Sequence, residues 1–331
     1  MLVLFRRAAP GTIILTIITA VVLWLGAFYR PLPASYLYGG VHMPLYDLLL
    51  QIADPVSARA VKASFLLVLL LSALLISVNT GLFFINRRTF LPAIIYLVVI
   101  SLFQSFHSLH PALIASLFVL LALRRLIGLY RTGRSAQISF DSALLISAGS
   151  LFYVNAIWYA LLLFIAMAVF RTFRARELIY AVAGLVTPYL LLSGIYFVGG
   201  DDISRGAMLF TDALISEQWA YQWSRINIVA GLFIAAALVV SILHLLSVLN
   251  TKKVRSRKVF ILLLWLIIIT PAIYMTVPSA SEELVFFFAM GVSYMITHYL
   301  VFAGSRTVSE IIFTGMILLA LVNQAMRFMP L

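Results

Sequence analysis

Residues 226–258 read INIVAGLFIAAALVVSILHLLSVLNTKKVRSRK, a long uncharged apolar run followed directly by lysines and arginines. An α-helix needs about 20 consecutive apolar residues to cross a hydrocarbon core about 30 Å thick. Positive charges beside such a run are typical of the cytoplasmic side of a membrane helix. The stretch therefore predicts a transmembrane helix over 226–249 whose C-terminal end faces the cytoplasm.

Similar apolar runs recur along the whole chain, in which 64% of 331 residues are apolar, 10% are charged and the mean hydropathy is +1.11. Soluble domains have about 25% charged residues, so this composition cannot cover a water-exposed surface. We predict an all-α polytopic membrane protein, a single transmembrane domain over 1–331 with about 11 helices. The predicted spans are 11–28, 63–85, 90–104, 111–126, 141–153, 156–170, 178–198, 226–249, 259–275, 284–302 and 308–326.

Two of these segments have alternative interpretations. The pair 141–153 and 156–170 is short, and it can form two spans or one re-entrant hairpin without changing the topology of the rest. The run 11–28 follows two arginines, as a signal peptide would, but it continues into Phe28-Tyr29-Arg30-Pro31 without a small-residue cleavage site. We interpret it as a retained span.

The distribution of charge supports this assignment and orients it. With the N-terminus in the cytoplasm and the C-terminus outside, 17 of the 23 Lys and Arg residues fall in inner segments, whereas eight of the 11 acidic residues fall in outer ones. This asymmetry follows the positive-inside rule. The basic run 252–258 is interpreted as a topology anchor that contacts anionic lipid headgroups. Nucleic-acid binding is not predicted, because no aromatic residues interleave with these charges.

Two outer segments, 29–62 and 199–225, are long enough to form a functional surface. In the first, Pro44 suits the start of a helix, and Asp47, Gln51 and Asp54 fall on one face of it. This pattern predicts a short amphipathic helix at the membrane surface with its carboxylates toward water. Asp47 or Asp54 is the candidate general base; the alternative is a merely solvated face. The opposite face consists of Leu45, Leu48, Leu49 and Ile52.

Other outer residues suggest a site for a phosphate or a lipid headgroup. Arg59, Arg205 and Arg225 suit a phosphate group on a surface that is otherwise acidic. His107 and His110 are three residues apart, which suits acid–base duty at a headgroup or, as a weaker alternative, a divalent metal; ordinary hydrogen bonding is the simplest role. No cofactor is predicted, and the chain has no cysteine for a disulfide or a thiolate site.

Aromatic residues end the second outer segment. Trp219, Tyr221 and Trp223 form either an interfacial belt or a stacking platform for a sugar or lipid headgroup. No charged residue lies deep inside a predicted span, which disfavours an ion-coupled carrier. The sequence also lacks a Walker A motif, HExxH and GxSxG, so it does not support an NTPase, a zincin protease or an α/β-hydrolase.

Several short motifs stand out in the middle of the chain: Leu121-Ala122-Leu123-Arg124-Arg125-Leu126, Phe140-Asp141-Ser142-Ala143-Leu144-Leu145-Ile146, Ser150-Leu151-Phe152-Tyr153, Phe170-Arg171, Arg174-Ala175-Arg176-Glu177 and Thr187-Pro188-Tyr189-Leu190. In these motifs the chain resembles a family of bacterial polytopic envelope proteins defined only as a domain of unknown function, and the resemblance implies the inner membrane of a bacterium. The layout is also distantly similar to GT-C-class membrane glycosyltransferases. That resemblance implies Asp47 or Asp54 as the base and Arg59, Arg205 or Arg225 on a lipid-linked phosphate. The chain departs from the class where Arg30-Pro31-Leu32-Pro33 replaces an acidic residue after the first span.

Three functions fit these features. The leading hypothesis is an envelope protein that handles a lipid-linked glycan or polyprenyl-phosphate substrate on the extracytoplasmic face, with GT-C-like glycosyl transfer as its chemistry. The second is a non-catalytic scaffold or assembly subunit with protein partners in the envelope. The third is a lipid or solute transporter, or a flippase, without ion coupling.

Overall fold

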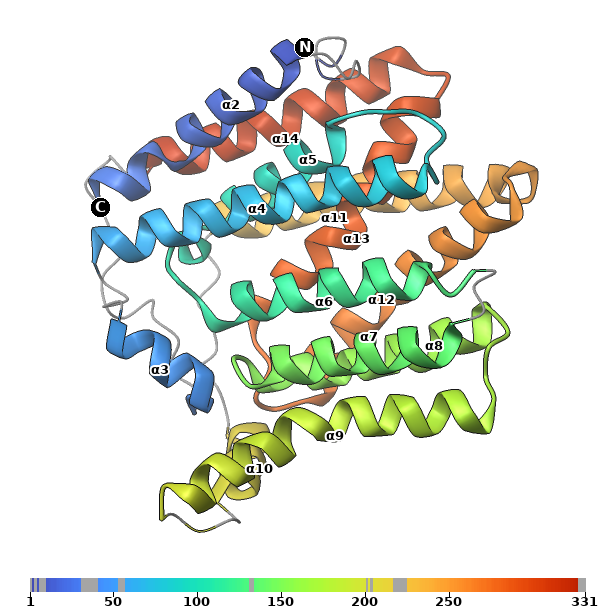
Figure 1. Ribbon diagram of the computed structural model, residues 1–331. Coiled ribbons are helices and arrows are strands. Elements are labelled where there is room, and N and C mark those ends of the chain that lie inside the picture. Colours follow the sequence, from blue (N-terminus) through green and yellow to red (C-terminus); the bar gives the residue numbers. More distant parts are fainter. Residues whose placement is uncertain are drawn as a thin grey trace.

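The computed structural model describes residues 2, 5, 10–30, 41–52, 57–130, 134–200, 202, 205–216 and 225–326. All regular structure among these residues is helical (Figure 1). The α-helices are α2 (Pro10–Tyr29), α3 (Pro44–Ile52), α4 (Ala58–Leu82), α5 (Leu91–Ser101), α6 (Pro111–Ile127), α7 (Ser135–Ser150), α8 (Ala160–Val169), α9 (Ala175–Val198), α10 (Arg205–Ile215), α11 (Arg225–Val248), α12 (Val254–Thr276), α13 (Val285–Phe302) and α14 (Arg306–Met326). Four short 3-10 helices join them: η2 (Gln104–His107), η3 (Val154–Tyr159), η4 (Leu249–Thr251) and η5 (Glu282–Leu284).

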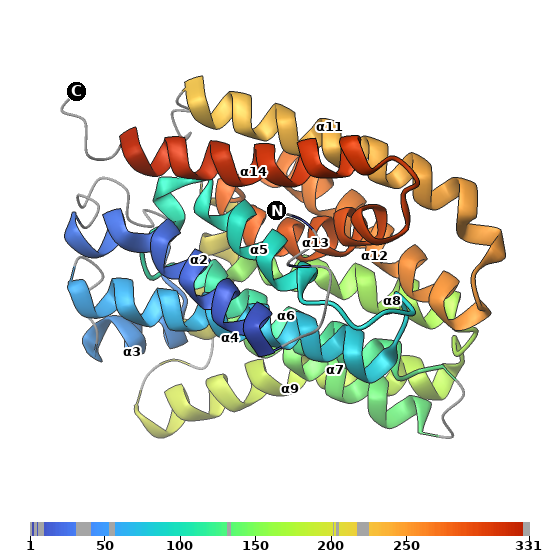
Figure 2. The ribbon, with the colours of Figure 1, turned by 90° about the horizontal axis from the view of Figure 1, so that it is seen from above.

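Seven of the described helices are long and apolar enough to cross a bilayer: α2, α4, α9, α11, α12, α13 with η5, and α14. In α9 and α11, only 22% and 28% of the most apolar window is buried inside the protein. These two helices lie at opposite edges of the bundle in Figure 2. Apolar helices with so much exposed surface need a hydrocarbon solvent, and they indicate a multi-pass α-helical membrane protein, as the sequence predicts.

The other expected spans coincide with shorter helices. α5 has 11 residues, which at about 1.5 Å per residue covers roughly half of a bilayer core. The α-helical structure is interrupted between α5 and α6, at 102–110, and again at 151–153, between α7 and the segment formed by η3 and α8. We call such interruptions helix breaks. All residues of α5 are buried, so its surroundings are protein rather than lipid.

The helix α13 forms the centre of the bundle. In its apolar window, 89% of the residues are buried, and it packs against α5, α11 and α12. The Tyr294 hydroxyl donates to the carbonyl of Leu75 on α4 over 2.8 Å. Gly291 allows close approach to α12, because an added Cβ would lie 2.6 Å from Ile267. Small residues serve this purpose in membrane helix packing.

The two ends of the bundle differ in chemistry. The α4–α5, α8–α9, α11–α12 and α13–α14 connections lie at one end, on the right of Figure 1. We call this the basic end, because Arg87, Arg171, Lys252, Lys253 and Arg306 lie in or beside these connections. The opposite end bears α3, α10 and the breaks between α5 and α6, α7 and α8, and α12 and α13 (Figure 1). We call it the α3 end.

Candidate functional site

The helix α3 lies across two of the breaks at the α3 end. The backbone N–H of Leu45 donates to the carbonyl of Leu151 over 3.2 Å. The Tyr46 hydroxyl donates to the carbonyl of Leu109 over 3.3 Å. Burial and the nearby Asp47 carboxylate raise the pKa of Tyr46 above its usual value, so the hydroxyl keeps its proton and remains a donor. These contacts fix the orientation of α3 on the bundle.

The exposed face of α3 presents an acid–imidazole pair. Nδ1 of His42 lies 3.1 Å from Oδ1 of Asp47, and the two side chains are 37% and 54% exposed. A donating Nδ1–H would leave Nε2 as the basic nitrogen of the ring. An exposed pair of this kind contributes little to stability. His42 escaped the sequence interpretation because it precedes the helix and shares no helical spacing with Asp47.

The amphipathic pattern predicted that α3 is a helix, but it did not predict which residues contact the bundle. The helix begins at Pro44, as predicted, and ends at Ile52. Met43 and Tyr46 provide its buried contacts, at 1% and 2% exposed, whereas Leu48 is 54% exposed. The buried contacts of α3 with the rest of the protein therefore come from residues outside the predicted apolar face, and Leu48 of that face is not covered by the bundle. Asp54 lies outside the described residues.

The two candidate histidines are buried in the bundle rather than on the surface. His107 is 1% exposed, its Nδ1 is 3.1 Å from the carbonyl of Gln104, and its ring contacts Trp24. His110 caps α6 by accepting a hydrogen bond from the Ala112 N–H over 3.1 Å. Burial lowers the pKa of His110 to about 3, so the ring is neutral near pH 7. The described residues contain no group of three or more potential metal ligands.

A buried polar network joins the break before η3 to the segment before α13. The Tyr153 hydroxyl donates to Oε1 of Glu283 over 2.8 Å, and the Ser281 hydroxyl donates to Oε2. Asn155 donates to the carbonyl of Ser279 over 2.8 Å and accepts from its hydroxyl over 3.0 Å. Tyr153, Asn155 and Ser279 are fully buried, and Glu283 is 3% exposed. The sequence interpretation counted Glu283 only as an outer charge. The signal available in the sequence was the pair Glu282-Glu283, two carboxylates directly before an apolar run.

The predicted phosphate-binding arginines lie on separate elements. Arg59, Arg205 and Arg225 each occupy the first turn of a different helix, α4, α10 and α11. The Arg205 guanidinium lies 5.5 Å from the ring centroid of Tyr196. Positive charge at a helix N-terminus opposes the helix dipole, so these positions would favour an anion as a neighbour. The aromatic candidates Trp219, Tyr221 and Trp223 lie outside the described residues.

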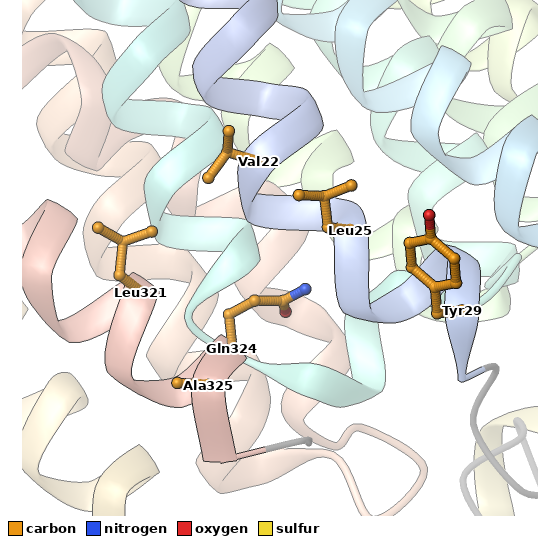
Figure 3. A pocket seen from close by; sticks show the side chains of 6 residues that line it. All are labelled: Val22, Leu25, Tyr29, Leu321, Gln324 and Ala325. Carbon is orange, nitrogen blue, oxygen red and sulfur yellow. The ribbon is translucent and has the colours of Figure 1, made fainter.

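A lateral groove of about 550 Å³ runs between α2 and α14 at the α3 end. Figure 3 shows side chains from the two helices facing each other across it. Asn323 positions this part of α14. Its backbone carbonyl accepts a hydrogen bond from Nε2 of Gln104 over 3.0 Å, and its side-chain amide donates to the backbone carbonyl of Leu102. The groove residues are Val22, Leu25, Tyr29, Leu321, Gln324 and Ala325.

Together these features define a multi-pass helical membrane protein with an acid–imidazole pair on one end and an apolar groove open to the side. No protein-family model, curated protein or solved structure matches this chain.

Proposed function

We propose that this protein handles a lipid-linked glycan or a polyprenyl-phosphate substrate at the extracytoplasmic face of a bacterial inner membrane. The observation that supports it most is the combination of the His42–Asp47 pair with the α2–α14 groove at the same end of the bundle. A lipid-linked substrate has two chemically different parts. An isoprenoid segment suits an apolar groove between lipid-facing helices, whereas a polar headgroup suits the surface presented by α3.

The proposal includes eleven crossings with the N-terminus in the cytoplasm and the C-terminus outside. In this arrangement α5, α6, α7 and α8 cross as short helices, of which α5 is wholly enclosed by its neighbours. The gathering of basic connections at one end of the bundle supports it, because that end would face the cytoplasm. The α3 end then faces outward.

The chemistry proposed is glycosyl transfer with the His42–Asp47 pair as the general base. Asp47 accepts a hydrogen bond from Nδ1 of His42 and orients the ring, and Nε2 takes the proton of an acceptor hydroxyl. The acceptor oxygen forms a bond to the anomeric carbon of the sugar as the bond from that carbon to the phosphate oxygen breaks. The polyprenyl phosphate leaves with the bonding electrons, and Arg59, Arg205 or Arg225 stabilises its charge.

Asp47→Asn tests this chemistry. The amide keeps the shape of the side chain but cannot stabilise a protonated His42, so we expect transfer activity to fall about 100-fold or more. The measurement is transfer from a polyprenyl-linked sugar donor by the purified protein, with rescue of a deletion strain as the cellular readout. The matched control is Gln51→Asn, one turn further along the exposed face of α3. Full activity and full rescue by Asp47→Asn would exclude a catalytic Asp47 and favour the scaffold alternative.

A further inference from the structure

The basic end contains a cluster of residues to which the proposed function assigns no role. It consists of His244 on α11, His298 and Phe302 on α13, Lys252 after η4, and Arg87 between α4 and α5. The rings of His244 and His298 have centroids 5.6 Å apart, and the His298 ring lies 5.0 Å from that of Phe302. We call these five residues the His298 cluster.

The histidines of this cluster have unmet hydrogen-bonding capacity. His298 is fully buried, and neither of its ring nitrogens has a hydrogen-bond partner. Nδ1 of His244 is likewise buried without a partner, so the two rings do not bond to each other through it. A buried polar nitrogen without a partner carries a free-energy penalty, and native proteins seldom leave several of them together. The three nitrogens therefore point to a polar group that the protein itself does not supply.

Two cations of the same cluster lie beside the ring of Phe302. Nζ of Lys252 is 3.9 Å from the ring centroid of Phe302, and the Arg87 guanidinium is 5.7 Å from it. Among the described residues, the ion pairs include neither Arg87 nor Lys252. The acids of this end have other contacts: Asp141 with Arg125 at 3.9 Å, Glu177 with Arg176 at 3.3 Å, and Glu310 with the Leu2 N–H at 3.4 Å. The missing group is consequently an anion rather than a cation.

We propose that the His298 cluster binds the phosphate of an anionic phospholipid. Lys252 and Arg87 attract the phosphate, and the imidazole N–H groups of His244 and His298 donate to its oxygens. The position on α11 favours a lipid over a free ion. His244 lies between Leu243 and Leu246, which are 62% and 50% exposed on a helix that faces the hydrocarbon, so the cluster borders on the lipid. Acyl chains would lie along this face of α11.

Lys252→Gln, with Lys253→Gln as its control, tests the proposal. Both lysines belong to the same connection, but Lys253 is exposed, is the N-cap of α12 and lies outside the cluster. Each protein is titrated with phosphatidylglycerol in mild detergent, and the bound lipid is counted by native mass spectrometry. We expect Lys252→Gln to weaken phosphatidylglycerol binding about fivefold, the effect of one lysine near anionic lipid, and Lys253→Gln to leave it unchanged.

His298→Phe is the second variant, since it keeps a flat ring of similar size and removes both nitrogens. We expect it to weaken phosphatidylglycerol binding as well, while phosphatidylcholine is retained weakly by all variants. Equal losses in the two lysine variants would show only general attraction to the basic end and would overturn the proposal. Displacement of the lipid by inorganic phosphate at equal concentration would also overturn it, because the cluster would then take the free ion.

Discussion

Glu283→Ala is expected to destabilise the protein by about 2–4 kcal/mol, because it removes the acceptor of two hydroxyl donors and opens a cavity in a buried polar network at once. Tyr153 and Ser281 both donate to the Glu283 carboxyl, and Tyr153 is fully buried. Single side-chain hydrogen bonds in membrane proteins average only about 0.6 kcal/mol, so the loss must come from the whole network rather than from one bond. The measurement is the temperature at which half of the detergent-solubilised protein leaves the monodisperse peak in size-exclusion chromatography.

The neighbouring carboxyl provides the control. Glu282 is only partly buried, and we expect Glu282→Ala to change stability by less than about 0.5 kcal/mol. Glu283→Gln keeps an acceptor for Tyr153 and should recover part of the loss. If Glu282→Ala and Glu283→Ala had equal effects, the network would have no special role in joining η3 to the start of α13.

Gly184→Leu is expected to separate α7 from α9 and to cost about 3 kcal/mol or more. A Cβ at Gly184 would lie 2.5 Å from the carbonyl oxygen of Phe140 and 2.8 Å from Cβ of Ala143. The closest contact is to backbone, which cannot move aside by a rotamer change. We expect little folded protein, measured as the monodisperse yield per cell and the same thermal transition.

The same helix offers a matched control at Gly194, where an added Cβ would meet nothing within 4 Å. Gly194→Leu should be neutral or slightly stabilising, because leucine has a higher helix propensity than glycine and faces lipid there. Equal losses at the two positions would mean that the α7–α9 contact does not depend on the missing side chain.

The helices were predictable from the sequence because each span is a contiguous apolar run. Helix ends were less so. The helix α7 begins at Ser135 rather than 141, since its polar first turns are stabilised by a contact with α9: the Ser135 hydroxyl donates to Oε1 of Glu177 over 2.7 Å. Hydropathy contains no information about such a partner. It also cannot tell that α5 is wholly surrounded by protein whereas α9 faces lipid.

The candidate site was predictable only in its exposed part. Asp47 could be chosen because helical spacing placed it on the polar face of a short helix. Glu283 could not, because Tyr153 is 130 residues away in the sequence and no local pattern links the two. The histidines illustrate the same limit: the spacing of His107 and His110 is visible, but their burial depends on how distant segments pack.

The most direct test of the proposed substrate is mass spectrometry of the lipids that co-purify with the protein in mild detergent. Leu25→Trp fills the α2–α14 groove, and Leu70→Trp places the same side chain on an exposed position of α4 outside it. We predict that the wild-type protein and Leu70→Trp retain a polyprenyl phosphate or a lipid-linked sugar and that Leu25→Trp loses it. Only bulk phospholipid in the wild-type protein, or equal retention of the polyprenyl lipid by both variants, would contradict the proposed role of the groove and its substrate.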